Sequence, residues 1–267
     1  MEKINKKVTI IKYGSDTLVS KNVEGKISID FNNICNHGLL IDKIDNPVII
    51  VSSGAVAFGK TFDKDFDYVK DEIIKRRIFA AIGNPHLSIN WDKSIPNKLV
   101  LQSLITHRDL ISKDSREKIA EVIAFLYKKD DAIIQVNDND FVTDEELRSI
   151  RNGDFGDNDE ITSLLAKLCA DLFDEVEVII NTSSDGILVD DKIIPLLKAR
   201  DLTDGYIDKI CGLNKSEMGF GGMSNKLKIF RDLILGSSIS EVHIINGKNP
   251  EHLMSLLDGK NVGTKIK

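Results

Sequence analysis

The sequence predicts an α/β fold, a three-layer α/β/α sandwich built on a central, mostly parallel sheet. Continuous β-branched runs recur along the chain, which indicates strands that are buried on both faces. These runs lie at residues 8–11, 48–51, 132–136, 176–180 and 242–245. Between them, apolar positions return every three or four residues, as at 115–129 and 159–171, which is typical of amphipathic helices. This alternation of strands and helices favours a parallel sheet covered by helices on both faces.

One domain is expected to span residues 1–267. Hydrophobic residues make up 42% of the chain, which is enough to bury a substantial core. No linker rich in Gly, Ser or Pro divides the sequence. The polar segments at 61–69 and 140–154 are the expected excursions from the sheet.

The overall charge excludes several classes of partner. The formal net charge is −6, which is the wrong sign for general attraction to nucleic acid or to an anionic membrane. The amino terminus lacks an apolar signal core, and no run of about 18 apolar residues could span a bilayer. Three cysteines without CxxC spacing favour reduced thiols. We therefore expect a cytoplasmic protein whose anionic ligands are met by locally placed cations.

Two strand ends carry small polar residues that suit anion binding. In open α/β sheets, ligands bind beyond the carboxyl ends of the strands. Lys12 and Gly14 follow the first predicted strand, and Ser53 and Gly54 follow the second. Backbone N–H groups at such turns can hold a phosphate or a carboxylate. A serine N-cap with a tight glycine turn explains the second turn equally well.

Acidic and amide side chains cluster between the third predicted strand and the helix after it. Four carboxylates and three amides fall close together: Asn137, Asp138, Asn139, Asp140, Asp157, Asn158 and Asp159. So many acceptors at neighbouring strand ends would repel one another without a cation between them. A substrate ammonium group, a lysine or Mg²⁺ would each meet that need.

A glycine-rich turn is expected to lead into a helix that starts near Ser224. Gly219, Gly221 and Gly222 stand just before Ser224 and Lys226. Backbone amides of such a turn can hold polyphosphate oxygens, and a lysine ammonium in the first helical turn balances their charge. The segment matches neither the Walker-type loop nor GxGxxG, which counts against a dinucleotide-binding Rossmann unit.

Five ordered motifs together resemble the amino acid kinase superfamily, and within it the glutamate 5-kinase family. KYGSDTL at 12–18 is similar to the family's KxGSSxL, and VSSGAVAFG at 51–59 is similar to SSGAxxxG. VNDND at 136–140, FGDND at 155–159 and GFGGMSNK at 219–226 are similar to INEND, FGDND and GTGGMxTK. The resemblance implies the amino acid kinase fold over the whole chain, without a C-terminal PUA domain.

The resemblance also implies a reaction, the ATP-dependent phosphorylation of the γ-carboxylate of L-glutamate. Its product would be L-glutamyl 5-phosphate, in the first step of proline biosynthesis. Mg²⁺ would be carried by the nucleotide rather than by a metal site of the protein, and the chain would form a homodimer or homotetramer. Such a reaction needs positioning and cations rather than a strong base, because the attacking carboxylate is already ionised near neutral pH.

Roles for individual residues follow from the same resemblance. Lys12 and Lys226 would flank the transferring phosphoryl group, and Asp157 would orient both lysines by ion pairing. Glutamate would be held by Ser53, Gly54, Asp140 and Asn158, with Asp140 as the partner of its ammonium group. The nucleotide would be bound by Lys12, Gly14, Thr182, Ser183, Phe220, Gly221, Gly222, Met223, Ser224, Asn225 and Lys226.

Three positions depart from the family pattern. Ser183 replaces the acidic residue of the family's TDxxGLY, and Phe220 replaces the threonine of GTGGM. Asp154 stands where a basic residue often precedes GDND. We therefore expect the contacts to the nucleotide and the affinity for glutamate to differ from those of the family.

The sequence is also compatible with two alternative functions. Another member of the superfamily could act on aspartate, acetylglutamate, carbamate or a nucleoside monophosphate. A regulatory relative could bind a nucleotide without catalysis, although the retention of Lys12, Asp157 and Lys226 argues against it. The combination of SSGAVA with NDND and GDND favours glutamate as the substrate.

Overall fold

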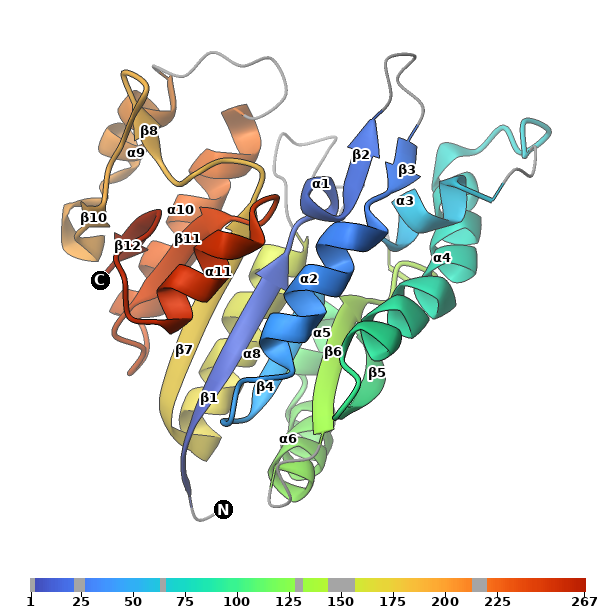
Figure 1. The fold of residues 1–267 in the computed structure, drawn as a ribbon, viewed down its shortest axis with the longest axis horizontal. Helices are drawn as coiled ribbons and strands as arrows, with labels where there is room; N and C mark the ends of the chain where they lie inside the picture. The colour runs from blue at the N-terminus through green and yellow to red at the C-terminus, as the bar shows by residue number, and fades with distance from the viewer. Residues whose placement is uncertain (1–2, 22–26, 63–65, 128–131, 144–156, 213–219) are drawn as a thin grey trace.

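The computed structural model describes residues 3–21, 27–62, 66–127, 132–143, 157–212 and 220–267. Within these residues, eight strands form one sheet in the order β10-β12-β11-β7-β1-β4-β6-β5 (Figure 1). Neighbouring strands run parallel except for β11 and β12, which are antiparallel. The predicted mostly parallel sheet is therefore confirmed.

The five predicted strands all belong to this sheet. Its members are β1 (Ile4–Tyr13), β4 (Val48–Ser52), β5 (Leu99–Ile105), β6 (Ala132–Asp138), β7 (Phe173–Thr182), β10 (Leu196–Leu197), β11 (Val242–Asn246) and β12 (Thr264–Ile266). Two antiparallel pairs lie outside it: β2 (Val19–Lys21) with β3 (Ile27–Ile29), and β8 (Leu188–Val189) with β9 (Lys192–Ile193). The prediction lacked β5, an edge strand that carries Gln102 and Ser103 and is only partly buried.

Helices cover both faces of the sheet. They are α1 (Ser15–Leu18), α2 (Phe31–Ile41), α3 (Ala55–Lys60), α4 (Glu72–Ser94), α5 (His107–Ile111), α6 (Lys113–Leu126), α8 (Asp157–Leu172), the 3₁₀ helix η1 (Ala199–Asp201), α9 (Asp204–Gly212), α10 (Phe220–Leu235) and α11 (Pro250–Leu257). The helices predicted at 115–129 and 159–171 correspond to α6 and α8. α6 ends at Leu126, and residues 128 and 129 of the prediction lie outside the described residues.

Two hydrophobic cores fill the space between the sheet and its two helical layers. Ile10 of β1 packs in one core with residues of α6, α8 and α10. Ile11, the next residue, packs in the other core with residues of α2, α4 and α11. Figure 1 shows α2 and α11 in front of the sheet and α8 behind it. Since successive strand residues point to opposite faces, this arrangement confirms the predicted three-layer sandwich.

Helices α3 and α4 pack unusually closely through two glycines. A Cβ atom added to Gly83 would lie 1.8 Å from the carbonyl oxygen of Ala55, and one added to Gly59 would lie 1.9 Å from that of Phe79. Backbone atoms fill both spaces, so any side chain there would push the helices apart. The contact fixes α4 against the first residue of α3, just after the turn at Ser53 and Gly54.

Within the described residues, no helix is both long and apolar enough to cross a membrane. The described parts of the two polar segments, 61–62 with 66–69 and 140–143, form turns and irregular backbone.

Candidate active site

Three charged side chains from distant parts of the chain meet in the interior. Lys12 comes from the carboxyl end of β1, Asp159 from the first turn of α8, and Lys226 from the second turn of α10. Lys12 Nζ lies 2.7 Å from Asp159 Oδ1, and Lys226 Nζ donates a hydrogen bond to Asp159 Oδ2. All three residues are buried. Two ammonium groups share one carboxylate, so the Lys–Asp–Lys trio carries one excess positive charge.

The strand alternation explains why Lys12 reaches this position. Ile10 of β1 packs against the layer that contains α8 and α10, and Lys12, two residues on, points to the same face. Gly14 follows directly, and its backbone N–H donates to Asn181 O of β7 at 3.3 Å. A Cβ atom on Gly14 would lie 3.8 Å from Lys12 Nζ. The turn that follows β1 therefore lies beside the trio.

Burial and charge together set the ionisation of the trio. Burial raises the pKa of Asp159, but the ammonium groups of Lys12 and Lys226 outweigh this and hold it at about 2. Burial lowers the pKa of Lys226 to about 8, although Asp159 opposes the change. Near neutral pH, Asp159 is ionised and most of Lys226 is protonated. A buried excess positive charge of this kind favours an anion beside it.

The carboxylate that pairs with both lysines is Asp159. The sequence interpretation gave this role to Asp157, whose side chain lies outside the described residues. Residues two positions apart on an α-helix point about 200° away from each other, so the FGDND motif alone does not settle which carboxylate meets the lysines. The structure corrects the assignment of the two ion pairs to Asp159.

A group of neutral polar side chains adjoins the trio at the carboxyl ends of β4 and β6. Asn158 Nδ2 donates to Ser53 Oγ at 2.9 Å and to Asn137 Oδ1 at 3.3 Å. Asn137 Nδ2 in turn donates to Asn84 Oδ1 of α4 at 2.8 Å. Asn158 Oδ1 is buried and accepts no hydrogen bond from the described part of the chain. A buried amide oxygen in this state is a ready acceptor for a ligand donor such as an ammonium group.

The turn after β4 is built around Gly54. Its φ of 109° lies in the left-handed region that favours glycine. Among the described residues, no side chain caps α3, and Ser53 Oγ accepts from Asn158 instead. The capping explanation of this turn is therefore wrong, and Ser53 faces the neighbouring strand end.

Asp140 lies just beyond β6 with a partner that the sequence interpretation did not identify. Asp140 Oδ1 is 4.0 Å from Arg76 Nη2 of α4. Burial raises the pKa of Asp140, and the guanidinium of Arg76 opposes this effect. The sequence interpretation assigned no role to Arg76. Asn84 lies in AAIGNPHL at 80–87, which is similar to the family's AAVGQxxL, but that resemblance did not give it a role either. Only the packing of α3 on α4 brings the two residues to this edge.

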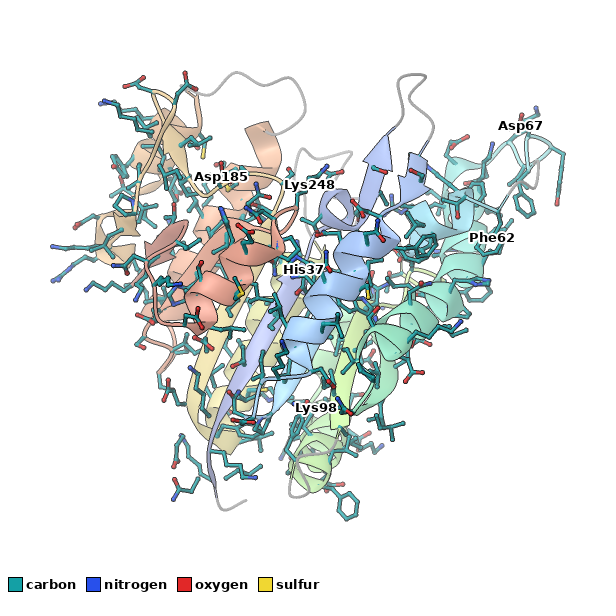
Figure 2. All side chains as sticks on the ribbon, viewed as in Figure 1. His37, Phe62, Asp67, Lys98, Asp185 and Lys248 are labelled. Carbon is teal, nitrogen blue, oxygen red and sulfur yellow. The ribbon has the colours of Figure 1, made fainter. Side chains whose placement is uncertain are left out.

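The end of β7 forms the other flank of the site. Thr182 Oγ1 donates within the loop to Ser184 O at 3.0 Å and is 3.3 Å from Ile245 O of β11. Ser183 is exposed to solvent. Asp185 and Lys248, in the loops that follow β7 and β11, lie on this side of the molecule in Figure 2.

Helix α10 starts earlier than the sequence suggested. It begins at Phe220, so Gly221 and Gly222 belong to its first turn and Lys226 to its second. The expectation of a glycine turn before the helix, with the lysine in the first turn, is corrected accordingly. Gly219 and the side chains of Phe220 and Gly221 lie outside the described residues.

The next residues of α10 use their side chains in different ways. Met223 packs against the core on the α8 side of the sheet. Ser224 Oγ donates to Asp208 Oδ1 at 3.3 Å. A Cβ atom on Gly222 would meet no atom of the described residues within 4 Å. Asn225 lies in the same turn as Lys226.

A buried network ties the sheet to α2 beneath the strand ends. His37 Nδ1 is 3.0 Å from the Tyr13 hydroxyl, and His37 Nε2 is 2.9 Å from Gly247 O. Burial lowers the pKa of His37 to about 4, so the ring is neutral near pH 7. His37 belongs to α2 and is fully buried (Figure 2). The network fixes the loop after β11 relative to β1.

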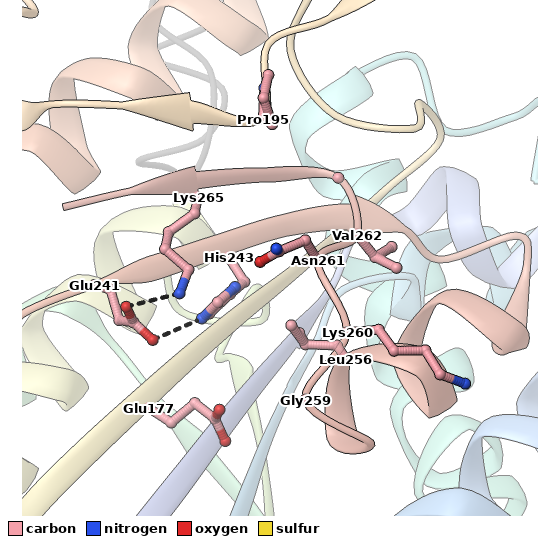
Figure 3. Close-up of a pocket in the computed structure, with 11 residues that line it drawn as sticks. Glu177, Pro195, Glu241, His243, Leu256, Gly259, Lys260, Asn261, Val262 and Lys265 are labelled. Atoms are coloured by element: carbon pink, nitrogen blue, oxygen red, sulfur yellow. Dashed lines mark hydrogen bonds and ion pairs between the residues drawn. The ribbon is translucent and has the colours of Figure 1, made fainter.

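A cavity of about 200 Å³ lies elsewhere, near the amino-terminal half of β7 (Figure 3). Glu177 in its wall accepts a hydrogen bond from Thr9 of β1, and Thr9 points to the opposite face of the sheet from Lys12. Glu241 in the same wall lies 3.1 Å from His243 Nε2 and 3.0 Å from Lys265 Nζ. The sheet therefore separates this cavity from the trio.

Within the described residues, no three His, Cys, Asp or Glu side chains are grouped so that they could hold a metal ion.

Comparisons with known proteins identify the family of this chain. Residues 7–246 match the family described as "Amino acid kinase family". The chain belongs to this family. It is 31% identical to the glutamate 5-kinase of Prochlorococcus marinus (strain NATL2A), over 96% of this chain and 68% of that protein. It is 28% identical to the glutamate 5-kinase of Haemophilus influenzae (strain ATCC 51907), over 98% of this chain and 69% of that protein.

The fold is shared with solved structures of the same class. The chain superposes on carbamate kinase from Giardia lamblia with a TM-score of 0.62 and 13% identity, over 98% of each chain. This likeness confirms the predicted amino acid kinase fold. The predicted resemblance to the glutamate 5-kinases is also confirmed, and membership of the family supports a phosphotransferase.

Proposed function

We propose that the protein transfers the γ-phosphoryl group of MgATP to the γ-carboxylate of L-glutamate. The products would be L-glutamyl 5-phosphate and ADP, in the first step of proline biosynthesis. The observation that carries the proposal is the buried Lys12–Asp159–Lys226 trio, with its excess positive charge, beside the polar group around Asn158. The named relatives support glutamate as the acceptor.

The chemistry of the transfer suits these residues. An oxygen of the substrate carboxylate forms a bond to the γ-phosphorus, the bond from that phosphorus to the β–γ bridging oxygen breaks, and its electron pair leaves with ADP. The carboxylate attacks without a base because it is already ionised. Lys12 and Lys226 stabilise the charge on the moving phosphoryl group. Asp159 holds both ammonium groups in place, the role first given to Asp157.

The nucleotide would bind between the turn after β1, the end of β7 and the start of α10. The residues assigned to it are Lys12, Gly14, Thr182, Ser183, Phe220, Gly221, Gly222, Met223, Ser224, Asn225 and Lys226. Mg²⁺ belongs to the MgATP substrate in this proposal, because its hard charge prefers the phosphate oxygens and water. Asp159 is already engaged by two lysines, which fits orientation rather than metal binding.

The substrate would bind on the other flank, at the ends of β4 and β6. Ser53, Gly54, Asp140 and Asn158 are the residues assigned to glutamate. Asp140 and Asn158 Oδ1, which accepts no hydrogen bond from the described residues, are acceptors suited to its ammonium group. In this proposal, the ammonium end would lie near α4 and the γ-carboxylate would point toward the trio.

A product assay tests the proposal directly. Purified protein with MgATP is given L-glutamate, L-aspartate, N-acetyl-L-glutamate, carbamate or UMP in parallel, and ADP release is followed. Hydroxylamine traps an acyl phosphate as a hydroxamate, which identifies the product independently of ADP. We expect L-glutamate to give the highest kcat/KM. Turnover of another acid in the absence of glutamate turnover would refute the assignment.

A further inference from the structure

An arginine and an aspartate from different elements lie side by side at the substrate end of the candidate site. Arg76 is in the second turn of α4, and Asp140 follows β6. The side chains are largely withdrawn from solvent, with exposed fractions of 25% for Arg76 and 13% for Asp140. Neither charge is needed to cap α4, because Asp71 already accepts from the N–H groups of Ile73 and Ile74. The pair therefore calls for an explanation other than helix stability.

We propose that Arg76 binds the α-carboxylate of the amino-acid substrate while Asp140 binds its α-ammonium group. The inference rests on the proposed function and adds a specificity-determining residue to it. An α-amino acid carries a cation and an anion on the same carbon atom. A site for this head group needs an anion and a cation close to each other, and Asp140 with Arg76 supplies them.

The contact between Arg76 and Asp140 leaves both side chains able to bind the head group of the substrate. The 4.0 Å from Nη2 to Oδ1 is an ion-pair distance and exceeds the length of a hydrogen bond. A guanidinium carries five N–H donors in a planar fork, so Arg76 can interact with more than one acceptor at once. Partial burial strengthens a charge-assisted hydrogen bond to a carboxylate, because less water competes for it.

The packing of α4 directs Arg76 toward the substrate end. Arg76 and Gly83 are seven residues apart and so lie on the same side of the helix. Gly83 touches Ala55, the first residue of α3, directly after the turn at Gly54. One residue further along α4, Asn84 is hydrogen-bonded to Asn137 of β6. Both contacts anchor this side of α4 to the strand ends that carry Ser53 and Asp140.

Two simple acids each lack one charged group of the head group, so together they distinguish binding of its carboxylate from binding of its ammonium group. Glutarate is glutamate without the ammonium group, and 4-aminobutyrate is glutamate without the α-carboxylate, yet each keeps the carboxylate that would accept phosphate. The experiment measures KM and kcat for L-glutamate, and the inhibition constant of each analogue against it. It uses the full chain as wild type, Arg76→Gln, Arg76→Lys and Asp140→Asn.

Arg76→Gln is expected to raise the KM for L-glutamate and the inhibition constant of glutarate about 10- to 100-fold, the usual loss for one charged hydrogen bond. The inhibition constant of 4-aminobutyrate should stay within about twofold, because its missing carboxylate makes no use of Arg76. Arg76→Lys keeps the charge and should restore part of the affinity for glutamate. Asp140→Asn should raise the inhibition constant of 4-aminobutyrate and leave that of glutarate unchanged.

Lys75→Gln is the matched control, since it removes a positive charge from the preceding residue of the same helix. Lys75 Nζ pairs with Asp67 at 2.8 Å, and Asp67 lies at the outer tip of the molecule (Figure 2). This variant should leave all the constants unchanged. Thermal unfolding of every variant checks that each is folded.

If Arg76→Gln raised the inhibition constants of glutarate and 4-aminobutyrate equally, the inference would be overturned, because Arg76 would then act only by supporting the fold around Asp140. An unchanged KM for glutamate would overturn it as well. Failure of the proposed function has a different signature, since the wild type itself would not phosphorylate L-glutamate, and both proposals would then fall.

Discussion

Two clusters of charged side chains in this molecule differ in burial and in charge balance. The Lys12–Asp159–Lys226 trio is buried, and its two cations share one carboxylate. The cluster of Glu241 with His243 and Lys265 lines the cavity in Figure 3, where the side chains of Glu241 and Lys265 are 38% and 31% exposed. In the second cluster one carboxylate meets one lysine side chain and one histidine ring.

This difference in burial and charge balance indicates which of the two clusters is suited to bind a ligand. Partly exposed ion pairs contribute at most about 1 kcal/mol and need no further partner, because water solvates what the pair leaves unbalanced. A buried excess charge has no such solvent, and it is costly until an anion binds. The trio also lies at the carboxyl ends of the strands, where ligands bind in open α/β sheets. Both criteria favour the trio over the cavity cluster as the place where a ligand binds.

Removal of the shared carboxylate should have the largest effect on the fold. Asp159→Asn leaves two buried ammonium groups uncompensated, and we expect the free energy of unfolding to fall by about 3–5 kcal/mol. Urea unfolding of the full chain measures this change. Asp171→Asn is the matched control on the same helix, because Asp171 pairs with Arg116 at the surface and should cost at most about 1 kcal/mol. Equal losses in the two variants would contradict the account.

The pH dependence of activity should report the lowered pKa of Lys226. This lysine is protonated below its pKa of about 8 and neutral above it, so the trio loses its excess charge as pH rises. We expect initial-rate kcat/KM for MgATP to fall through about pH 8 and to approach a slope of about tenfold per pH unit. Lys228→Gln, two residues along α10, should show the same profile. A flat profile well above pH 8 would contradict a role for the Lys226 ammonium.

The cavity cluster should give the smallest effect. Glu241→Gln removes the carboxylate that meets His243 and Lys265, and we expect a loss of at most about 1 kcal/mol in the free energy of unfolding. The kcat and KM for glutamate should stay within about twofold. A large loss of activity with an intact fold would show that the cavity contributes to the reaction.

The sequence predicted the sheet well because its central strands are continuous β-branched runs. It missed β5, where Gln102 and Ser103 interrupt the apolar pattern at a sheet edge. It also missed α4, which carries Pro85 within its length and packs through glycines rather than through a regular apolar stripe. Local pattern cannot indicate a helix whose position depends on close backbone contact.

The sequence predicted the site residues that a motif identifies by itself. It did not predict those whose contacts depend on the direction of the side chain in the fold. Lys12 and Lys226 meet as expected, and Ser53 meets Asn158. Asp157 and Asp159 share one motif, and only the direction of each residue on α8 distinguishes them. Arg76 reaches Asp140 through the packing of α3 on α4, which no spacing in the sequence encodes.

The most direct test of the central claim is the effect of Lys226→Ala on kcat and KM with MgATP and L-glutamate. The account predicts that kcat falls by about 10²- to 10³-fold, as for the loss of one group that stabilises transition-state charge. The KM for glutamate should change by no more than about threefold, and Lys228→Ala should change neither constant. An unchanged kcat in Lys226→Ala would contradict the assignment of phosphoryl transfer to the trio.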